Sequence, residues 1–123
     1  MCVLEVMKEI ASQRDDFNSD RNFVAASMRF FLDLDALPEC RAEMTVIQEL
    51  FSLEDCISFE LAEHLMGEFS NIADFLEENL KTLTKGSIDG DLQCRLLIRA
   101  VRCAIDVLDT VLNVINNLEE NNK

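Results

Sequence analysis

Residues 95–118, RLLIRAVRCAIDVLDTVLNVINNL, carry the longest apolar pattern in the chain. Apolar side chains recur there at alternating spacings of four and three residues: Leu97, Val101, Ala104, Leu108, Val111, Ile115 and Leu118. A heptad repeat sustained this far predicts an α-helix that packs almost parallel to its neighbours with a left-handed crossing. Asp89 or Asp91 can cap this helix, which we expect to end near Asn117.

The apolar side of this predicted helix is unusually wide. Its apolar side chains cover about 200° of the helical circumference, roughly twice what a surface helix needs. The helix is therefore either central in a bundle or part of a homodimer interface, and both alternatives stay open. Either role would fall mainly on five residues: Leu97, Val101, Leu108, Val111 and Ile115.

The rest of the chain also favours helices. Its 123 residues contain only three Gly and one Pro, too few turn residues for a sheet protein. Apolar periodicity predicts further helices over 2–13, 20–34, 38–51 and 52–85, with Gly67 as a candidate break in the last of these. Gly86 fits a left-handed C′ position, and 87–91 reads as a loop. We predict an all-α, single-domain bundle over residues 1–123, with about five (four to six) antiparallel helices.

Two apolar rows run along the predicted helix 20–34. Phe23, Ser27, Phe30 and Leu34 form the first row, and Val24, Met28 and Phe31 form the second. Together they predict one broad apolar face toward the core. In the region 52–85, Ser52 is the expected start of the helix.

The cysteine pattern indicates a reducing compartment. The five cysteines are odd in number and none has C-x-x-C spacing: Cys2, Cys40, Cys56, Cys94 and Cys103. Secreted short chains usually show even counts, so we expect reduced core thiols rather than disulfides or a metal site. The N-terminus lacks a secretory signal pattern, and charges interrupt the most apolar stretch, 96–118. A soluble, cytoplasmic protein is expected.

Charge is segregated along the sequence. The chain has 24 acidic and 11 basic residues, a net charge of −13, yet residues 42–80 contain ten acids and no Lys or Arg. Such a charge disfavours direct binding to nucleic acid or to an anionic membrane and favours a basic protein partner. The acids expected to bind that partner form what we call the acidic ridge: Glu60, Glu63, Glu68, Asp74, Glu77 and Glu78. The alternative is a face that serves only solubility.

Arg95, Arg99 and Arg102 form the one basic cluster, at spacings of four and three residues. Asp91 and Asp106 stand at i,i+4 spacing from the first and last of them, which predicts ion pairs within the helix. The alternative is that this basic stripe meets the acidic ridge, within the bundle or across a dimer.

His64 is the single histidine, four residues from both Glu60 and Glu68. We interpret it as a boundary histidine paired with carboxylates. One helix presents ligands from one side only and the chain has no second histidine, so no metal site is predicted. The sequence also lacks a Walker loop, a G-x-G-x-x-G segment and an H-E-x-x-H motif, so neither an enzyme nor a cofactor is expected.

The segment His64-Leu-Met-Gly67 resembles the phosphorylated segment of histidine-containing phosphotransfer domains, which are acidic helical bundles. In that family a Lys and then a Gly follow just after the His. Here Met66 replaces the basic residue and Gly67 comes one position early. The resemblance implies an alternative function, a signalling bundle with His64 as an exposed phosphoryl acceptor.

These features favour a non-enzymatic protein–protein interaction module. Immunity proteins, antitoxins, secretion chaperones and inhibitors of nucleic-acid enzymes share this profile of size and charge, an analogy of type only. We expect an inhibitor-like or chaperone-like protein that binds a basic, nucleic-acid-processing partner through the acidic ridge. A structural subunit that dimerises through its C-terminal helix is a further alternative.

Overall fold

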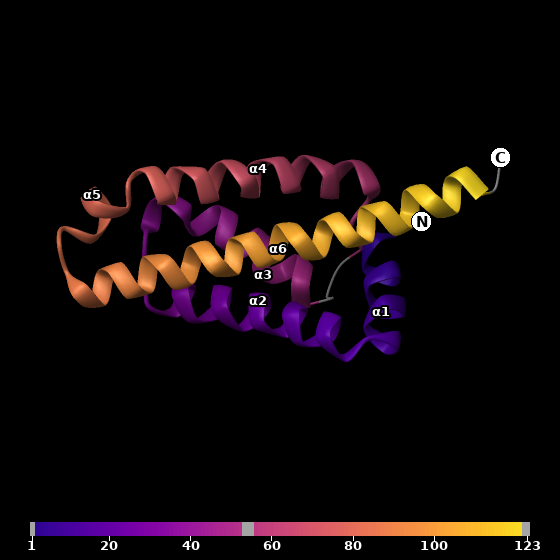
Figure 1. The fold of residues 1–123 in the computed structure, drawn as a ribbon, viewed down its shortest axis with the longest axis horizontal. Helices are drawn as coiled ribbons and strands as arrows, with labels where there is room; N and C mark the ends of the chain where they lie inside the picture. The colour runs from indigo at the N-terminus through magenta and orange to yellow at the C-terminus, as the bar shows by residue number, and fades with distance from the viewer. Residues whose placement is uncertain (1, 53–55, 122–123) are drawn as a thin grey trace.

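The computed structural model describes residues 2–52 and 56–121, and over these residues the chain is helical with no strand (Figure 1). The elements are α1 (Val3–Gln13), α2 (Asp15–Asp33), the 3₁₀ turn η1 (Pro38–Cys40), α3 (Arg41–Ser52), α4 (Phe59–Glu78), α5 (Leu80–Thr84) and α6 (Ile88–Asn121). The prediction of an all-α bundle with a long C-terminal helix is confirmed.

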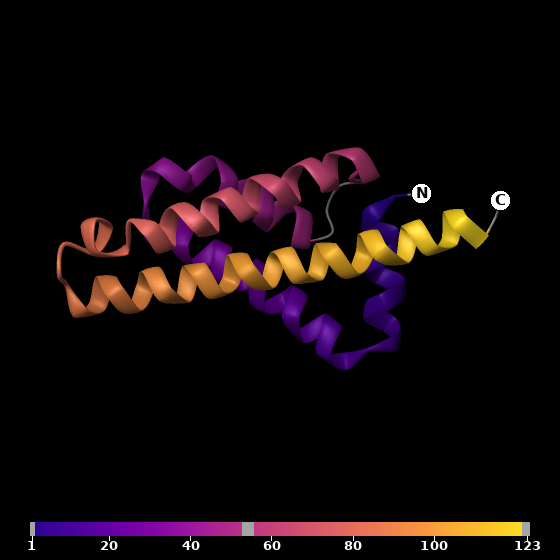
Figure 2. The ribbon, with the colours of Figure 1, turned by 45° about the horizontal axis from the view of Figure 1, so that its top comes forward.

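Helix α6 runs the length of the molecule and contacts α1, α2, α4 and α5 (Figures 1 and 2). The five residues predicted to lie in the core or at a dimer interface, Leu97, Val101, Leu108, Val111 and Ile115, are buried within the single chain. Leu118, the last heptad residue, is 41% exposed because the end of α6 extends past α2 and α4. None of the described helices combines the length and apolarity that crossing a bilayer requires.

Helix α2 departs from its prediction at its start and across its faces. It begins at Asp15 instead of Asp20, because Phe17 is buried and gives this polar stretch a core contact. Asp15 and Asp16 in the first turn also complement the helix dipole. Of the two predicted apolar rows, Val24, Met28 and Phe31 are buried, whereas Phe23, Phe30 and Leu34 are exposed. The prediction of one broad core face was therefore wrong.

The turn between α2 and η1 is held by Arg41. Its guanidinium donates to the carbonyl of Leu32 and to the carboxylate of Asp35, both at 3.2 Å. Pro38 occupies the first position of η1, where its missing N–H needs no partner, as predicted. This arrangement folds α3 back along α2.

Helix α4 begins later than predicted and is not broken by its glycine. Ser58 is its N-cap and accepts from the N–H of Leu61, whereas the hydroxyl of Ser52 donates to the carbonyl of Glu49 at the end of α3. The intervening 53–55 lie outside the described residues. Helix α4 runs through Gly67 without interruption and ends at Glu78. Gly67 was a wrong candidate because it lies on the exposed side, where no packing contact acts on the backbone.

The connection to α6 is tighter than the predicted loop. Lys85 and Gly86 both adopt left-handed conformations, with φ of 52° and 77°. Ser87 then accepts from the N–H of Gly90, and α6 starts at Ile88. Residues 88–91, predicted as loop, form the first helical turn of α6, so Ser87 takes the capping place expected of Asp89 or Asp91.

The cysteines also depart from prediction. Cys2 and Cys56 form a disulfide, with Cα atoms 5.8 Å apart, so the expectation of five reduced thiols was wrong. The N–H of Val3 donates to the carbonyl of Ile57 (2.9 Å), which brings these distant segments together. Cys40, Cys94 and Cys103 are free thiols. Burial raises the pKa of all three, that of Cys103 to about 11, so they stay protonated near neutral pH.

Candidate interaction surface on helix α4

The acidic ridge lies on the outer side of α4. Helix α4 packs against α6 through its buried Ala62, Phe69, Ala73 and Leu76. All six carboxylates predicted for the ridge are exposed: Glu60, Glu63, Glu68, Asp74, Glu77 and Glu78. They cover an outward surface on the opposite side of α4 from the core.

The apolar stripe of α4 is rotated from the predicted one. In the sequence, Leu61, Leu65, Phe69, Ile72 and Leu76 form one apolar stripe at helical spacing, and such a stripe is expected to face the core. In the structure the small side chains of Ala62 and Ala73 face the core, so the helix turns its stripe partly outward. Leu61 and Phe75 are each 44% exposed as a result. The outer surface of α4 thus combines carboxylates with two exposed apolar side chains.

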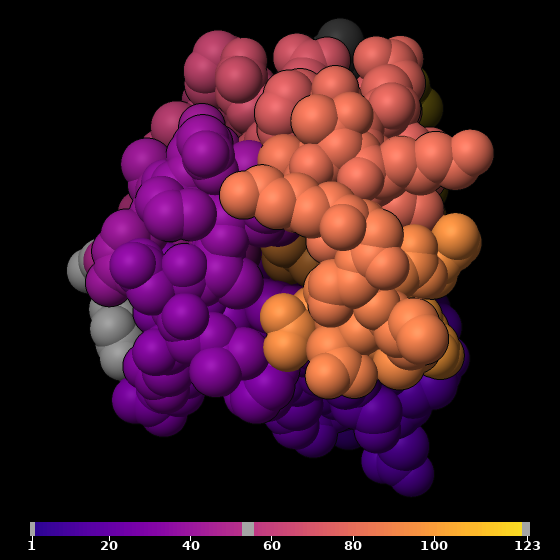
Figure 3. Space-filling view, turned by 90° about the vertical axis from the view of Figure 1, so that its left-hand side faces the viewer, coloured from indigo at the N-terminus to yellow at the C-terminus, as the bar shows by residue number. Residues whose placement is uncertain are grey.

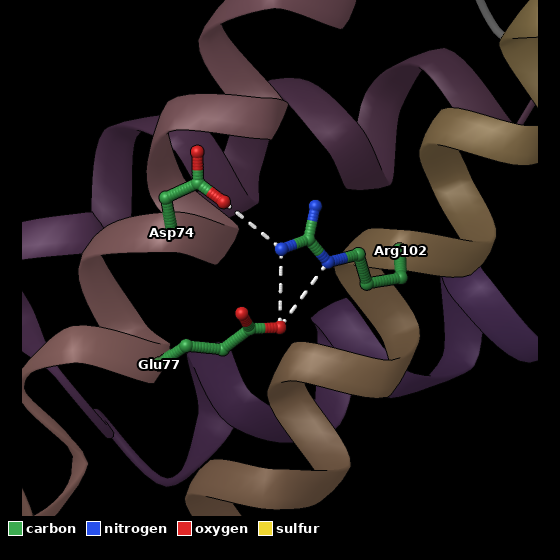
Figure 4. A network of polar contacts seen from close by, with 3 residues as sticks. All are labelled: Asp74, Glu77 and Arg102. Carbon is green, nitrogen blue, oxygen red and sulfur yellow. Dashed lines mark hydrogen bonds and ion pairs between the residues drawn. The ribbon is translucent and has the colours of Figure 1, made fainter.

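Arg102 of α6 joins one part of the ridge to the bundle (Figure 4). Its Nη2 lies 2.9 Å from Oδ1 of Asp74 and 3.1 Å from Oε1 of Glu77, and its Nε also donates to Glu77. The hydrogen bonds to Asp74 and Glu77 raise the pKa of the Arg102 guanidinium, and the bond to Asp74 has the larger effect. All three side chains are about half exposed, so each ion pair stabilises the fold by at most about 1 kcal/mol.

The three arginines of the basic cluster have different contacts. Arg95 pairs with Asp91 within α6, at 2.7 Å, as the helical spacing predicts. Arg102 contacts the ridge within the bundle instead of Asp106. The guanidinium of Arg99 lies over the ring of Phe23, 5.8 Å from its centroid. Arg95 thus forms the ion pair predicted within the helix, and Arg102 forms the alternative contact with the acidic ridge.

The contacts of Arg102 divide the ridge into two parts. Asp74 and Glu77 have a cation partner. In the part of the chain that the structure describes, the other four carboxylates form no ion pair. We call these four the outer quartet: Glu60, Glu63, Glu68 and Glu78. The outer quartet is the largest concentration of charge on α4 that has no counter-charge.

His64 is exposed on the same side of α4. The ion pairs with Glu60 and Glu68 that the sequence suggested do not form. Over residues 2–52 and 56–121, no three His, Cys, Asp or Glu side chains are grouped so that they could hold a metal ion.

A hollow of about 200 Å³ opens at the end of the bundle where α2 turns into η1 and α5 turns into α6 (Figure 3). Phe31, Leu37, Leu83 and Leu97 line it, with the thiol of Cys94. Ligand pockets are usually about 300–1,000 Å³, so this hollow is too small for most cofactors.

Sequence reasoning missed a second exposed surface, on α2 and α6. Six large apolar side chains are exposed there: Phe23, Phe30, Leu34, Ile88, Leu92 and Leu96. The signal was the presence of two apolar rows on α2, because the first row, Phe23, Phe30 and Leu34, adds to what one helix face can bury. Comparison with protein-family models, curated proteins and solved structures finds no match.

Proposed function

We propose that this protein is a non-enzymatic binding module whose α4 surface docks a basic protein. The observation that carries the proposal is the outer quartet, four exposed carboxylates that have no cation partner among the residues the structure describes. A face that serves only solubility usually mixes both signs of charge through i,i+4 pairs. Residues 42–80 contain no Lys or Arg with which α4 could form such pairs.

The apolar neighbours of the quartet support the same proposal. Leu61 and Phe75 are exposed on the same helix as the carboxylates. In protein interfaces, buried aromatic and aliphatic anchors supply most of the affinity, and surrounding charges set the association rate and the choice of partner. A surface of this composition suits a partner that offers apolar pockets between lysines and arginines.

The chemistry of the quartet narrows the partner class. A protein that processes nucleic acid carries a basic surface for phosphates. A row of carboxylates held by a helix can occupy that surface and exclude the nucleic acid, which is how an inhibitor-like or immunity-like protein would act. A net charge of −13 also speeds encounter with such a surface at low ionic strength.

Charge reversal with a matched control tests the proposal. The test variant carries Glu60→Lys, Glu63→Lys, Glu68→Lys and Glu78→Lys. The control reverses four exposed acids of α6, Asp106, Asp109, Glu119 and Glu120, and so changes the net charge equally. Each protein is immobilised and used to capture partners from lysate of its source cells at low and high salt, and bound proteins are identified by mass spectrometry.

The expected result is a basic protein that binds the wild type and the control at low salt and is released at high salt. The quartet variant should not bind it, while its circular dichroism stays helical. Capture of the same protein by the quartet variant would mean that the α4 surface is only solvated.

A further inference from the structure

Six exposed apolar side chains of α2 and of the first half of α6 lie on the faces of the two helices that flank the contact of Arg99 with Phe23. Ile88 is 81% exposed, Leu92 57% and Phe30 52%, the largest values among the exposed apolar residues. Of the nine large apolar residues exposed in the described chain, six belong to this group. We call it the α2–α6 strip: Phe23, Phe30, Leu34, Ile88, Leu92 and Leu96.

Observed contacts fix the register of the two helices. The thiol of Cys103 donates to the carbonyl of Asp20 (3.9 Å), and Arg99 lies over Phe23. The helices are therefore antiparallel. Spacings of three and four residues carry the same face of α2 from Phe23 to Phe30 and Leu34, and the same face of α6 from Arg99 to Leu96, Leu92 and Ile88. The six apolar side chains thus continue from the contact of Arg99 with Phe23 toward one end of the bundle.

The strip is as large as the largest apolar patches of monomeric proteins. Its exposed fractions together correspond to several hundred Å², within the range of about 300–600 Å² for such patches, which are often functional. A stable protein–protein interface covers about 800 Å² on each partner. The strip with its polar margin therefore provides the apolar centre of an interface of ordinary size.

The charges at the ends of the strip indicate what covers it. Arg99 lies at one end, beside Phe23. Asp33 and Asp89 are exposed at the other end, beside Leu34 and Ile88. A second copy turned by a two-fold axis would place each Arg99 against the acidic end of its partner. Asp20 and Asp106 are also exposed near Arg99, so the arrangement rests on the pairing of Arg99 with Asp33 and Asp89 and not on a net basic end.

We propose that a second copy of this chain covers the α2–α6 strip, with the two α2 helices antiparallel across a two-fold axis. For two chains of charge −13, mutual repulsion is smallest when the interface holds few acids. The strip meets this condition, whereas α4 does not. Helices α4 and α2 lie along different edges of α6 (Figure 1), and the outer quartet lies on the side of α4 away from the core, so we expect both quartets to remain uncovered in the dimer.

This dimer differs from one built on the heptad residues of α6. Leu97, Val101 and Leu108 are already buried within a single chain. The interface proposed here uses the opposite edge of the same helix, together with α2. It is also independent of the basic partner proposed for α4, because the two surfaces share no residue.

The mass of the full chain in solution tests the proposal. Sedimentation velocity from about 1 µM to about 1 mM detects any dimer with a Kd below about 1 mM. We expect twice the chain mass of 14.0 kDa. Phe30→Glu with Leu92→Glu should raise the Kd by at least about 100-fold, since it places charge in an apolar centre. The control, Leu61→Glu with Phe75→Glu, changes equally exposed side chains of α4 by the same charge and should stay dimeric.

A second variant distinguishes loss of the interface from misfolding. Phe30 makes an edge-on contact with Phe31, 5.4 Å between ring centroids, so its replacement could disturb the core. Leu92→Glu with Leu96→Glu leaves that contact intact and should also be monomeric. Far-UV circular dichroism should show unchanged helix in every variant. A wild type that is monomeric at about 1 mM, or a dimer that survives both strip variants, would overturn the proposal.

Charge exchange tests the antiparallel arrangement. Arg99→Asp should weaken the dimer by about tenfold, and adding Asp33→Arg with Asp89→Arg should restore it, because the ion pairs reform with reversed signs. Failure of the restored variant to dimerise would overturn the two-fold arrangement. Neither result depends on whether α4 binds a basic partner, so either proposal can be wrong while the other holds.

Discussion

The outer surfaces of α4 and of the α2–α6 strip differ in what each leaves without a partner. Within residues 2–52 and 56–121, four carboxylates of α4 lack a cation, whereas six large apolar side chains along the strip lack a cover. Charge interactions are screened by salt and apolar burial is not. The partner binding proposed for α4 should therefore weaken as salt is raised, whereas the dimer proposed for the strip should persist.

Helix α6 carries both a core residue, Leu108, and a residue of the strip, Leu92. Leu108→Ala removes a fully buried side chain and should lower the free energy of unfolding by about 2–5 kcal/mol. Leu92→Ala, on the exposed edge, should change it by less than about 0.5 kcal/mol under conditions where the protein is monomeric. Urea unfolding at low concentration measures both. Similar losses would place Leu92 in the core.

The Cys2–Cys56 disulfide includes no residue of the α2–α6 strip. It closes a loop between Cys2 and Cys56 with a sequence separation of 54, next to the start of α4. Cys56→Ser should therefore lower the free energy of unfolding by about 2–4 kcal/mol, measured by thermal melting without reductant. Dimer formation through the strip should be retained. Reduction of the wild type is the control and should lower the melting temperature similarly.

Salt should distinguish the two kinds of binding without any mutation. Raising NaCl from about 0.1 M to about 1 M shortens the Debye length from about 10 Å to about 3 Å. Capture of a basic partner by α4 should fall at least about tenfold, because it relies on exposed charge. The dimer mass should persist in the same buffers. A dimer that dissociates with salt would mean that Arg99 and its acidic counterparts, not apolar burial, hold the two copies together.

The smallest effect concerns the ridge itself. Arg102→Ala removes the cation held by Asp74 and Glu77 and should lower stability by at most about 1 kcal/mol, because the pairs are exposed. It should also raise affinity for the basic partner a few-fold, since two more carboxylates become available. Titration calorimetry with the captured partner checks this. Unchanged affinity would confine docking to the outer quartet.

Local patterns in the sequence were sufficient for the fold class and for much of the core. The heptad of 97–118 predicts α6, and six of its seven members are buried. Capping and turn chemistry at Pro38 and Gly86 is also local, because it depends on backbone conformations that these residue types favour. The exposure of the acidic ridge follows from the periodicity of α4 in the same way.

Tertiary packing decided what a single helix cannot express. Whether both apolar rows of α2 are buried depends on how many neighbours surround that helix, and α3 and α6 cover only the row of Val24, Met28 and Phe31. The Cys2–Cys56 disulfide and the contact of Arg102 with Asp74 and Glu77 join residues far apart in the sequence. Periodicity reports which side chains share a face of one helix. Which faces meet, and so which charges and apolar side chains remain without partners, is set only when all the helices compete for the same core.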